Sequence, residues 1–287
     1  MRSIEQPGPV HPERVQCAPA KLRAVEVQLQ QGVTLLEGLA DVVRSHGVSS
    51  AVFSLRGGSF APLAYYMPAL SETPEHVAYF SDRFEATGEA RIDSGSITFG
   101  LRKGEPSLHC HAIWTEPDGR RRSGHLIPNE SRVASPVQLQ AWMLDGAGFE
   151  AAADLETNFN LMQVSAGDAP PGGTNALVVR LRPNQDLCLA LESLCAERNI
   201  RRASIRGGVG SLIGAVFDDG RTVEPFVTEV FVRTGKIEPG PDGSPRASVD
   251  VGLVAHSGEI AQGWLKRGKN PVLITFELVI EPQGKTP

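Results

Sequence analysis

The sequence predicts an α/β protein of the α+β kind, built from two tandem copies of one domain. Each copy is expected to be an antiparallel-rich β-sheet or partial barrel with one main helix. Three observations predict this: the chain repeats itself in order, each repeat has one stretch of helical periodicity, and alternating β-rich segments follow that stretch. Since apolar residues recur every 3.6 positions in a helix and every second position in a strand, each copy should run strand, helix, strand, then further strands.

The repeat is visible as short matches that keep their order along the chain. A stretch beginning at Leu29 matches one beginning at Leu181, and both copies contain an Arg-Gly-Gly sequence. The matched pairs are Arg56–Gly58 with Arg206–Gly208, Phe84–Gly88 with Phe231–Gly235, Ser107–His111 with Ser248–Gly252, Gly124–Leu126 with Gly263–Leu265, and Ser135–Val137 with Asn270–Val272. Preserved order with small gaps indicates a duplication.

Each copy contains one predicted helix. In the first copy it spans Leu35 to Arg44, and its apolar stripe consists of Leu35, Leu36, Leu39, Val42 and Val43. Its counterpart in the second copy spans Leu187 to Glu197. Both helices should end near a residue suited to left-handed backbone, Gly47 or Asn199.

Strands are predicted on both sides of these helices. Ala51–Leu55 and Ala203–Ile205 follow the helices and run into the Arg-Gly-Gly turns, while Ala247–Ala255 and Pro271–Glu281 are β-rich and alternating. A segment between Trp142 and Leu161 has no counterpart in the second copy and is left unassigned. The matches predict a flexible leader over residues 1–21, a first domain over 22–162, a Pro- and Gly-rich linker over 163–175, and a second domain over 176–287.

The composition is that of a globular protein. Of 287 residues, 41% are hydrophobic and 21% charged, and no apolar run approaches the roughly 20 residues of a membrane helix. The N-terminus lacks the hydrophobic core of a signal peptide. The four cysteines (Cys17, Cys110, Cys188 and Cys195) have no disulfide-framework spacing. We therefore expect a cytoplasmic protein that does not enter a membrane.

The charge balance disfavours nucleic acid as a partner. The formal net charge is −5, whereas proteins that hold a phosphate backbone are usually basic. The densest basic cluster, Arg120–Arg122, follows Asp118-Gly119, a hairpin-turn signal. We interpret the cluster as a solvated turn.

Three of the seven histidines lie close together in the sequence: His109, His111 and His125. In a strand every second side chain projects to the same face, so His109 and His111 project together and Cys110 points away. A histidine on a neighbouring strand can complete a three-nitrogen site with one open position, which is typical of catalytic zinc. The alternative is two half-buried polar residues and a turn histidine without a metal.

The two copies differ where the histidines lie. The matched positions in the second copy are Asp250, Gly252 and Trp264, although framework residues such as Gly263 and Leu265 are kept. Histidines needed only for packing would have no reason to differ together. The asymmetry therefore predicts one functional site in the first copy, with the second copy as its scaffold.

The order of these motifs resembles the plant and prokaryote conserved (PPC) domain, also called DUF296 or PD1-like. That family has His-x-His, then Gly-Gly-His-Leu, then a strand with Thr-Glu-Leu. The first copy has His109-Cys-His111 and Ser123-Gly-His-Leu126, with Ser in place of the first Gly. The second copy has Thr275-Phe-Glu-Leu278 and Gly208-Val-Gly-Ser-Leu212 without the histidines. The resemblance covers residues 22–162 and 176–282.

The resemblance implies a compact domain that commonly assembles as a homo-oligomer, often a trimer. Plant members bind DNA through an AT-hook, and this chain has no Arg-Gly-Arg-Pro hook. The fold is also similar to that of acetolactate decarboxylase, whose zinc is held by His-x-His and a later His. By that similarity His109, His111 and His125 would bind one Zn²⁺ per chain, with Mn²⁺ or Fe²⁺ as alternatives.

Three further residues are candidates for chemistry beside the metal. Glu85, or Glu89, is the candidate acid/base, the alternative being a solvated carboxylate. Arg56 enters a Gly-Gly turn and is the candidate clamp for a substrate carboxylate, although Arg206 repeats it and favours a structural role equally. Tyr65 is the candidate proton donor, the alternative being a core aromatic.

Together these features predict a zinc-dependent lyase or hydrolase that acts on a small oxo- or hydroxy-carboxylate, so the partner expected is a small anionic substrate. Two other readings stay open at this point. In the first, the chain is a non-enzymatic, DNA-associated regulator. In the second, it is a binding module whose histidines hold a small anion directly.

Overall fold

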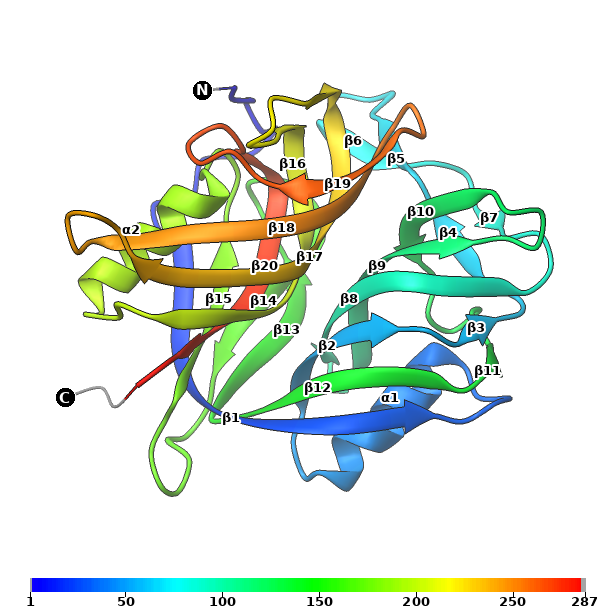
Figure 1. Ribbon diagram of the computed structural model, residues 1–287, viewed down its shortest axis with the longest axis horizontal. Helices are drawn as coiled ribbons and strands as arrows, with labels where there is room; N and C mark the ends of the chain where they lie inside the picture. The colour runs from blue at the N-terminus through cyan, green and yellow to red at the C-terminus, as the bar shows by residue number, and fades with distance from the viewer. Residues whose placement is uncertain (1, 285–287) are drawn as a thin grey trace.

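The computed structural model of the protein describes residues 2–284, the side chain of Pro225 excepted. Two sheet-rich halves lie side by side, and each carries one helix (Figure 1). The first half contains β1 (Val15–Leu29), α1 (Leu35–Ser45), β2 (Ser50–Arg56), β3 (Ser59–Phe60), β4 (Ala64–Tyr66), β5 (Pro68–Leu70), β6 (Ala78–Phe80), β7 (Phe84–Glu85), β8 (Ala90–Arg102), β9 (Glu105–Thr115), β10 (Arg121–Leu126), β11 (Val133–Ser135), β12 (Val137–Asp145), β13 (Ala147–Ala153) and β14 (Asn160–Ala166). The second half contains β15 (Ala176–Leu181), α2 (Leu187–Glu197), β16 (Ala203–Val216), β17 (Thr222–Pro239), β18 (Pro245–Ala255), β19 (Ile260–Trp264) and β20 (Val272–Pro282).

The two halves share one strand order. In the first half the main sheet runs β1–β12–β2–β8–β9–β10, and in the second half it runs β15–β20–β16–β17–β18–β19. Every pairing in these two series is antiparallel, and neither series returns to its first strand within residues 2–284. The predicted α+β class and the duplication are confirmed, as an open sheet in each half.

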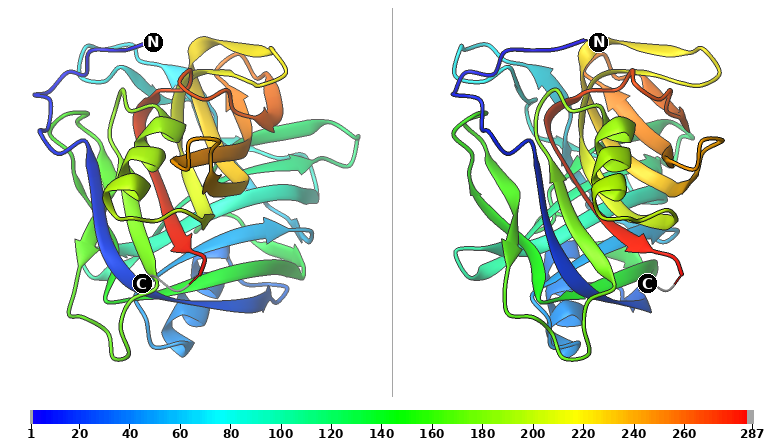
Figure 2. Two further views of the ribbon diagram at one scale, coloured as in Figure 1. Left: turned by 60° about the vertical axis from the view of Figure 1, so that its left-hand side comes forward. Right: turned by 90° about the vertical axis from the view of Figure 1, so that its left-hand side faces the viewer.

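Strand β1 belongs to both sheets. Its first residues, 15–20, pair with β15, and residues 21–29 pair with β12, so one continuous strand crosses from one half to the other (Figure 2). The segment before it also packs on the second half, where the buried Gln6 side chain donates from Nε2 to the Leu273 carbonyl at 2.7 Å. The stretch expected as a flexible leader therefore contains part of a strand and a buried contact, because its polar groups find partners there.

Both helices lie where the sequence predicts them, and each begins at a capping residue. Thr34 and Glu37 form a capping box at the start of α1, and the Asp186 side chain accepts from the Leu189 backbone at the start of α2. The left-handed residues that follow are Gly47 and Asn199, with φ of 71° and 57°. Neither helix in residues 2–284 is long and apolar enough to cross a membrane.

The segment that the sequence leaves unassigned forms a hairpin of β13 and β14. It joins the first sheet through a parallel bridge between Glu150 and Leu101. In the connection between its strands, Asp154 binds Arg180 at 2.8 Å and Arg182 at 2.5 Å, both on or just after β15. All three side chains are buried. The hairpin is thus tied to the second half by a buried charge cluster.

Candidate metal centre

The backbone brings the three histidines together at the meeting of the two halves. His109 and His111 project from one face of β9, while Cys110 is buried on the other. Antiparallel pairing of β10 with β9 sets His125 directly opposite His111. His111 Nε2 lies 3.1 Å from His109 Nε2 and 3.3 Å from His125 Nδ1. Two nitrogens bound to one tetrahedral zinc lie about 3.3 Å apart, given bonds of about 2.0–2.1 Å, so the spacing fits a metal.

The remaining ring nitrogens are held by oxygen atoms of the second half. His111 Nδ1 lies 3.0 Å from the Val230 carbonyl, which only accepts, so this nitrogen carries the hydrogen. His109 Nδ1 lies 2.7 Å from Glu277 Oε2 and donates to that carboxylate. In the neutral rings both Nε2 atoms then carry lone pairs. Carboxylate or carbonyl partners on the far nitrogen are the usual support of metal-binding histidines.

Burial keeps the His111 and His125 rings neutral. It lowers the pKa of His111 well below its usual value, with the neighbouring His109 and His125 adding to the effect and the Val230 carbonyl opposing it. Burial, together with His109, lowers the pKa of His125 to about 3. Neutral imidazole is the form that binds a metal, so these two rings are ready to bind one at neutral pH.

Two glutamates of the second half face the triad. Glu277 on β20 is fully buried against His109, and Glu229 on β17 places Oε2 3.9 Å from His111 Nε2. That Glu229 oxygen has no hydrogen-bond partner in the described part of the chain. Burial raises the pKa of Glu229 to about 8, against a lowering by the His125 backbone. The second copy therefore places two buried carboxyl groups beside the histidines.

Glu277 is the near end of a buried hydrogen-bonded chain. The Thr275 hydroxyl donates to Glu277 Oε1 at 2.8 Å and accepts from Arg180 Nε at 3.0 Å. Arg180 in turn binds Asp154. His109 is thus held through Glu277, Thr275 and Arg180 by a carboxylate in the β13–β14 hairpin.

A cavity of about 80 Å³ opens beside the triad. Residues of the β5–β6 hairpin, which lies near the top of the molecule in Figure 1, line this cavity. Its aromatic wall consists of Tyr79, Phe80 and Phe159. The Phe80 ring centre lies 5.1 Å from that of His125. The cavity is small and mainly apolar, and no Lys or Arg side chain of residues 2–284 lines it.

The structure does not bring Arg56, Tyr65 or Glu85 to this cavity. Arg56 ends β2 and lines a different cleft. The Tyr65 ring is buried in the first core, 4.6 Å from the Trp114 ring. Glu85 is exposed on a short edge strand and pairs with Arg83 at 2.9 Å. Tyr65 lies on the opposite face of β4 from Tyr66, which pairs with His125, so strand parity turns it away from the triad. Arg56 and Glu85 lie on the same sheet face as the histidines, at strand positions that do not reach the cavity. Glu89, the other carboxylate considered, accepts a hydrogen bond from Ser59 and does not line the cavity either.

The ladders also correct the match between the copies. His111 faces His125 across β9 and β10, and Asp250 faces Trp264 across β18 and β19. By position Asp250 therefore replaces His111, whereas the sequence match sets Gly252 there, two residues further on. In the second copy Asp250 pairs instead with Arg233 at 3.0 Å. The shared serines, Ser107 and Ser248, suggested the displaced register.

The sequence could have pointed to the two missed glutamates. Glu277 is the one carboxylate in the apolar run 272–280, and Glu229 is the one carboxylate in the run 227–232. A charge buried in such a run needs a partner. The sequence could not say that this partner is a histidine of the other copy.

A family model matches the chain in two segments. The model is described as the Plants and Prokaryotes Conserved (PCC) domain and matches residues 18–144 and 169–282. A comparison with curated proteins found no match. A plant- and prokaryote-conserved (PPC) protein from Pyrococcus horikoshii is 17% identical, with a TM-score of 0.41 over 50% of this chain and 94% of that one.

Two further solved structures match to a similar extent. A metal-containing protein from Archaeoglobus fulgidus is 19% identical, with a TM-score of 0.41 over 49% of this chain and 93% of its own. A candidate DNA-binding protein from Ralstonia eutropha is 16% identical, with a TM-score of 0.40 over 49% and 90%. The likeness to acetolactate decarboxylase stays a prediction. Since the family model matches both copies and most of the chain, the protein belongs to the Plants and Prokaryotes Conserved domain family, with two tandem domains in one chain.

Proposed function

We propose that His109, His111 and His125 bind one divalent metal ion between the two domains. The observation that carries this is the 3.1 Å contact between the Nε2 atoms of His109 and His111, whose Nδ1 atoms both donate to oxygen acceptors. With both rings neutral, the two Nε2 lone pairs would repel at that distance, and a shared cation removes the repulsion. A set of three imidazoles suits zinc, whereas manganese prefers oxygen ligands.

We propose further that the site is catalytic, as a lyase or hydrolase. Three protein ligands leave a position open for water or substrate, the arrangement of catalytic zinc. A bound zinc ion there would polarise a carbonyl group or lower the pKa of a water molecule. Glu229 is the acid/base group in this proposal, because its Oε2 lies 3.9 Å from His111 Nε2 and has no hydrogen-bond partner among residues 2–284.

The cavity favours a small oxo- or hydroxy-carboxylate as substrate. Its volume of about 80 Å³ admits few atoms, and its aromatic wall suits the apolar part of such a molecule. Since no cationic side chain of the described residues lines the cavity, the anionic group must be held at the metal position. In this proposal the metal position, and not Arg56, holds the substrate carboxylate.

The test is turnover of a panel of 2-oxo acids, 2-hydroxy acids and small esters by zinc-loaded protein. We expect Glu229→Gln to lose at least about a hundredfold in kcat, the typical share of a general acid or base, while keeping its zinc. The matched control is Glu259→Gln, an exposed glutamate in the turn between β18 and β19.

Two results would overturn the catalytic proposal. One is turnover that survives removal of the metal or the Glu229→Gln change. The other is zinc-loaded protein that turns over no member of the panel, which would favour a regulator or a ligand-binding module instead.

A further inference from the structure

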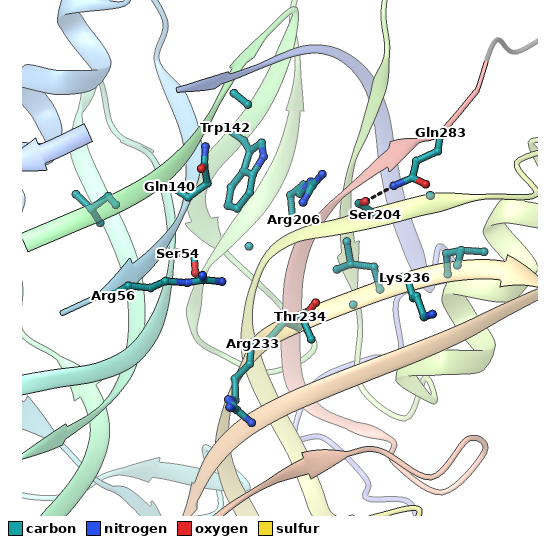
Figure 3. A pocket seen from close by; sticks show the side chains of 18 of the residues that line it. Ser54, Arg56, Gln140, Trp142, Ser204, Arg206, Arg233, Thr234, Lys236 and Gln283 are labelled. Atoms are coloured by element: carbon teal, nitrogen blue, oxygen red, sulfur yellow. Dashed lines mark hydrogen bonds between the residues drawn. The ribbon is translucent and has the colours of Figure 1, made fainter. Parts of the chain in front are cut away.

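A second and larger cleft, of about 800 Å³, lies between the two domains. The first domain contributes residues of β1, β2 and β12, and the second contributes residues of β16, β17 and the segment after β20 (Figure 3). None of its lining residues lines the cavity beside the histidines. The cleft is therefore a separate site, and its chemistry goes beyond the proposed metal centre.

The cleft is cationic in a chain whose net charge is −5. Its charged lining consists of Arg56, Arg202, Arg206, Arg233 and Lys236 against Glu26 and Glu238. Four of these five cations have carboxylate partners: Arg206 pairs with Glu281 at 2.7 Å, and Arg233 with Asp250 at 3.0 Å. Glu238 pairs with both Arg202 at 3.8 Å and Lys236 at 2.5 Å. The Arg56 side chain makes no hydrogen bond or ion pair with the residues the structure describes, so an exposed guanidinium is free for a ligand.

Both arginines of the repeated Arg-Gly-Gly sequence line this cleft, one from each domain. Figure 3 shows Arg56 on β2 and Arg206 beside Trp142. The guanidinium of Arg206 lies 5.2 Å from the centre of the Trp142 ring, which fixes its plane. Hydroxyl and amide groups of Ser54, Thr234 and Gln140 add neutral hydrogen-bonding groups to the lining.

We propose that this cleft binds a small polyanion, a molecule carrying two or more phosphate or carboxylate groups. Guanidinium groups bind both by paired hydrogen bonds. A cleft of this size falls within the range of small-molecule sites, and arginines on both walls suit a ligand with anionic groups at two ends. The ligand would bridge the two domains.

The test is calorimetric titration with inorganic tripolyphosphate and with citrate, at about 0.15 M salt, where surface charge is largely screened. We expect saturable binding of at least one probe, and the tighter of the two identifies phosphate or carboxylate as the preferred group. Arg56→Gln should weaken that binding at least about tenfold, the usual effect of losing a charged hydrogen bond. The matched control, Arg44→Gln, removes the same charge from the exposed end of α1 and should bind within about twofold of wild type.

Both probes also bind metals, so the titrations are repeated in the His109→Ala, His111→Ala double variant, where the affinity should not change. Three outcomes would overturn the proposal. They are absence of saturable binding by either probe, equal losses in Arg56→Gln and Arg44→Gln, or loss of binding in the histidine double variant.

Discussion

His109 is held from both ends of its ring. Nε2 faces the triad, and Nδ1 donates to Glu277, which is fixed by the Thr275 hydroxyl and, beyond it, by Arg180. A hydrogen bond on the far nitrogen sets the tautomer and the plane of a metal-binding ring. The Thr275 hydroxyl makes no hydrogen bond to the triad among residues 2–284, so its contribution to metal binding acts through the position of the Glu277 carboxylate.

Replacing Thr275 by Val should therefore weaken zinc binding about tenfold, at the lower end of the range found for such supporting groups. The measurement is the zinc Kd by competition with a chelating dye, with the Tm recorded beside it. The control is Thr98→Val. Thr98 is buried, lies opposite His109 in the ladder, and its hydroxyl has no hydrogen-bond partner among residues 2–284. Equal Kd values for the two variants would contradict the role given to Thr275.

At this scale the sequence predicted the histidines and missed their partners, for a physical reason. Strand parity and one hairpin bring His109, His111 and His125 together, and both are local properties. Glu229 and Glu277 reach the triad only because the second sheet packs on the first, which no local pattern encodes. Tyr65 was assigned before the face of its short strand was known, and that strand turns it into the first core. Glu85 shares the face of His125 but lies exposed on the edge strand β7, outside the cavity.

Among the elements, the β13–β14 hairpin connects the site to the rest of the chain. Its Asp154 carboxylate binds Arg180 and Arg182 with side chains that are almost completely buried. Burial alone would raise the pKa of Asp154, but the hydrogen bonds and charges of the two arginines outweigh it and hold that pKa below its usual range. Removing this carboxylate would leave two buried cations without a partner.

Asp154→Asn should accordingly lower the free energy of unfolding by about 3–5 kcal/mol at pH 7. Because the folded pKa lies below the unfolded value of about 3.9, this stabilisation is full above that pH and is lost as the pH falls through the folded pKa. Urea unfolding at pH 7 and pH 3 should show the gap to wild type narrowing at the lower pH. The exposed Asp145→Asn serves as control. A gap of the same size at both pH values would contradict this assignment.

The elements themselves were predictable to very different degrees. Both helices are set by apolar spacing and capping residues, so the sequence located them. The long strands were predicted from the alternation of apolar and polar residues. The β13–β14 hairpin has no counterpart in the second copy, and its stability depends on Arg180 and Arg182 of the other half, so nothing in its own sequence revealed it.

Across the whole molecule, the duplication has produced two domains that cannot be treated separately. Strand β1 pairs with both sheets, and the candidate metal centre takes its histidines from one domain and its carboxylates from the other. A metal bound there should stabilise the folded chain as a unit, since a ligand that binds only the folded state adds to its stability.

Zinc at about a hundred times its Kd should add about 2.7 kcal/mol to the free energy of unfolding, and the chain should melt in one transition at a higher Tm. Calorimetry of metal-free and zinc-loaded protein measures this directly. His111→Ala should show no zinc-dependent shift, whereas His11→Ala, which alters an exposed ring of the N-terminal segment, should shift as wild type does. Separate transitions for the two domains, with only one moved by zinc, would contradict a centre that joins them.

The most direct test of the central claim is the metal content of purified protein, combined with X-ray absorption at the zinc edge. The account predicts about one zinc per chain, bound by three imidazole nitrogens at about 2.0–2.1 Å, and no zinc in the His109→Ala, His111→Ala variant. Zinc-free wild-type protein that stays so after zinc is added would contradict it. So would a variant that retains the metal with an unchanged spectrum.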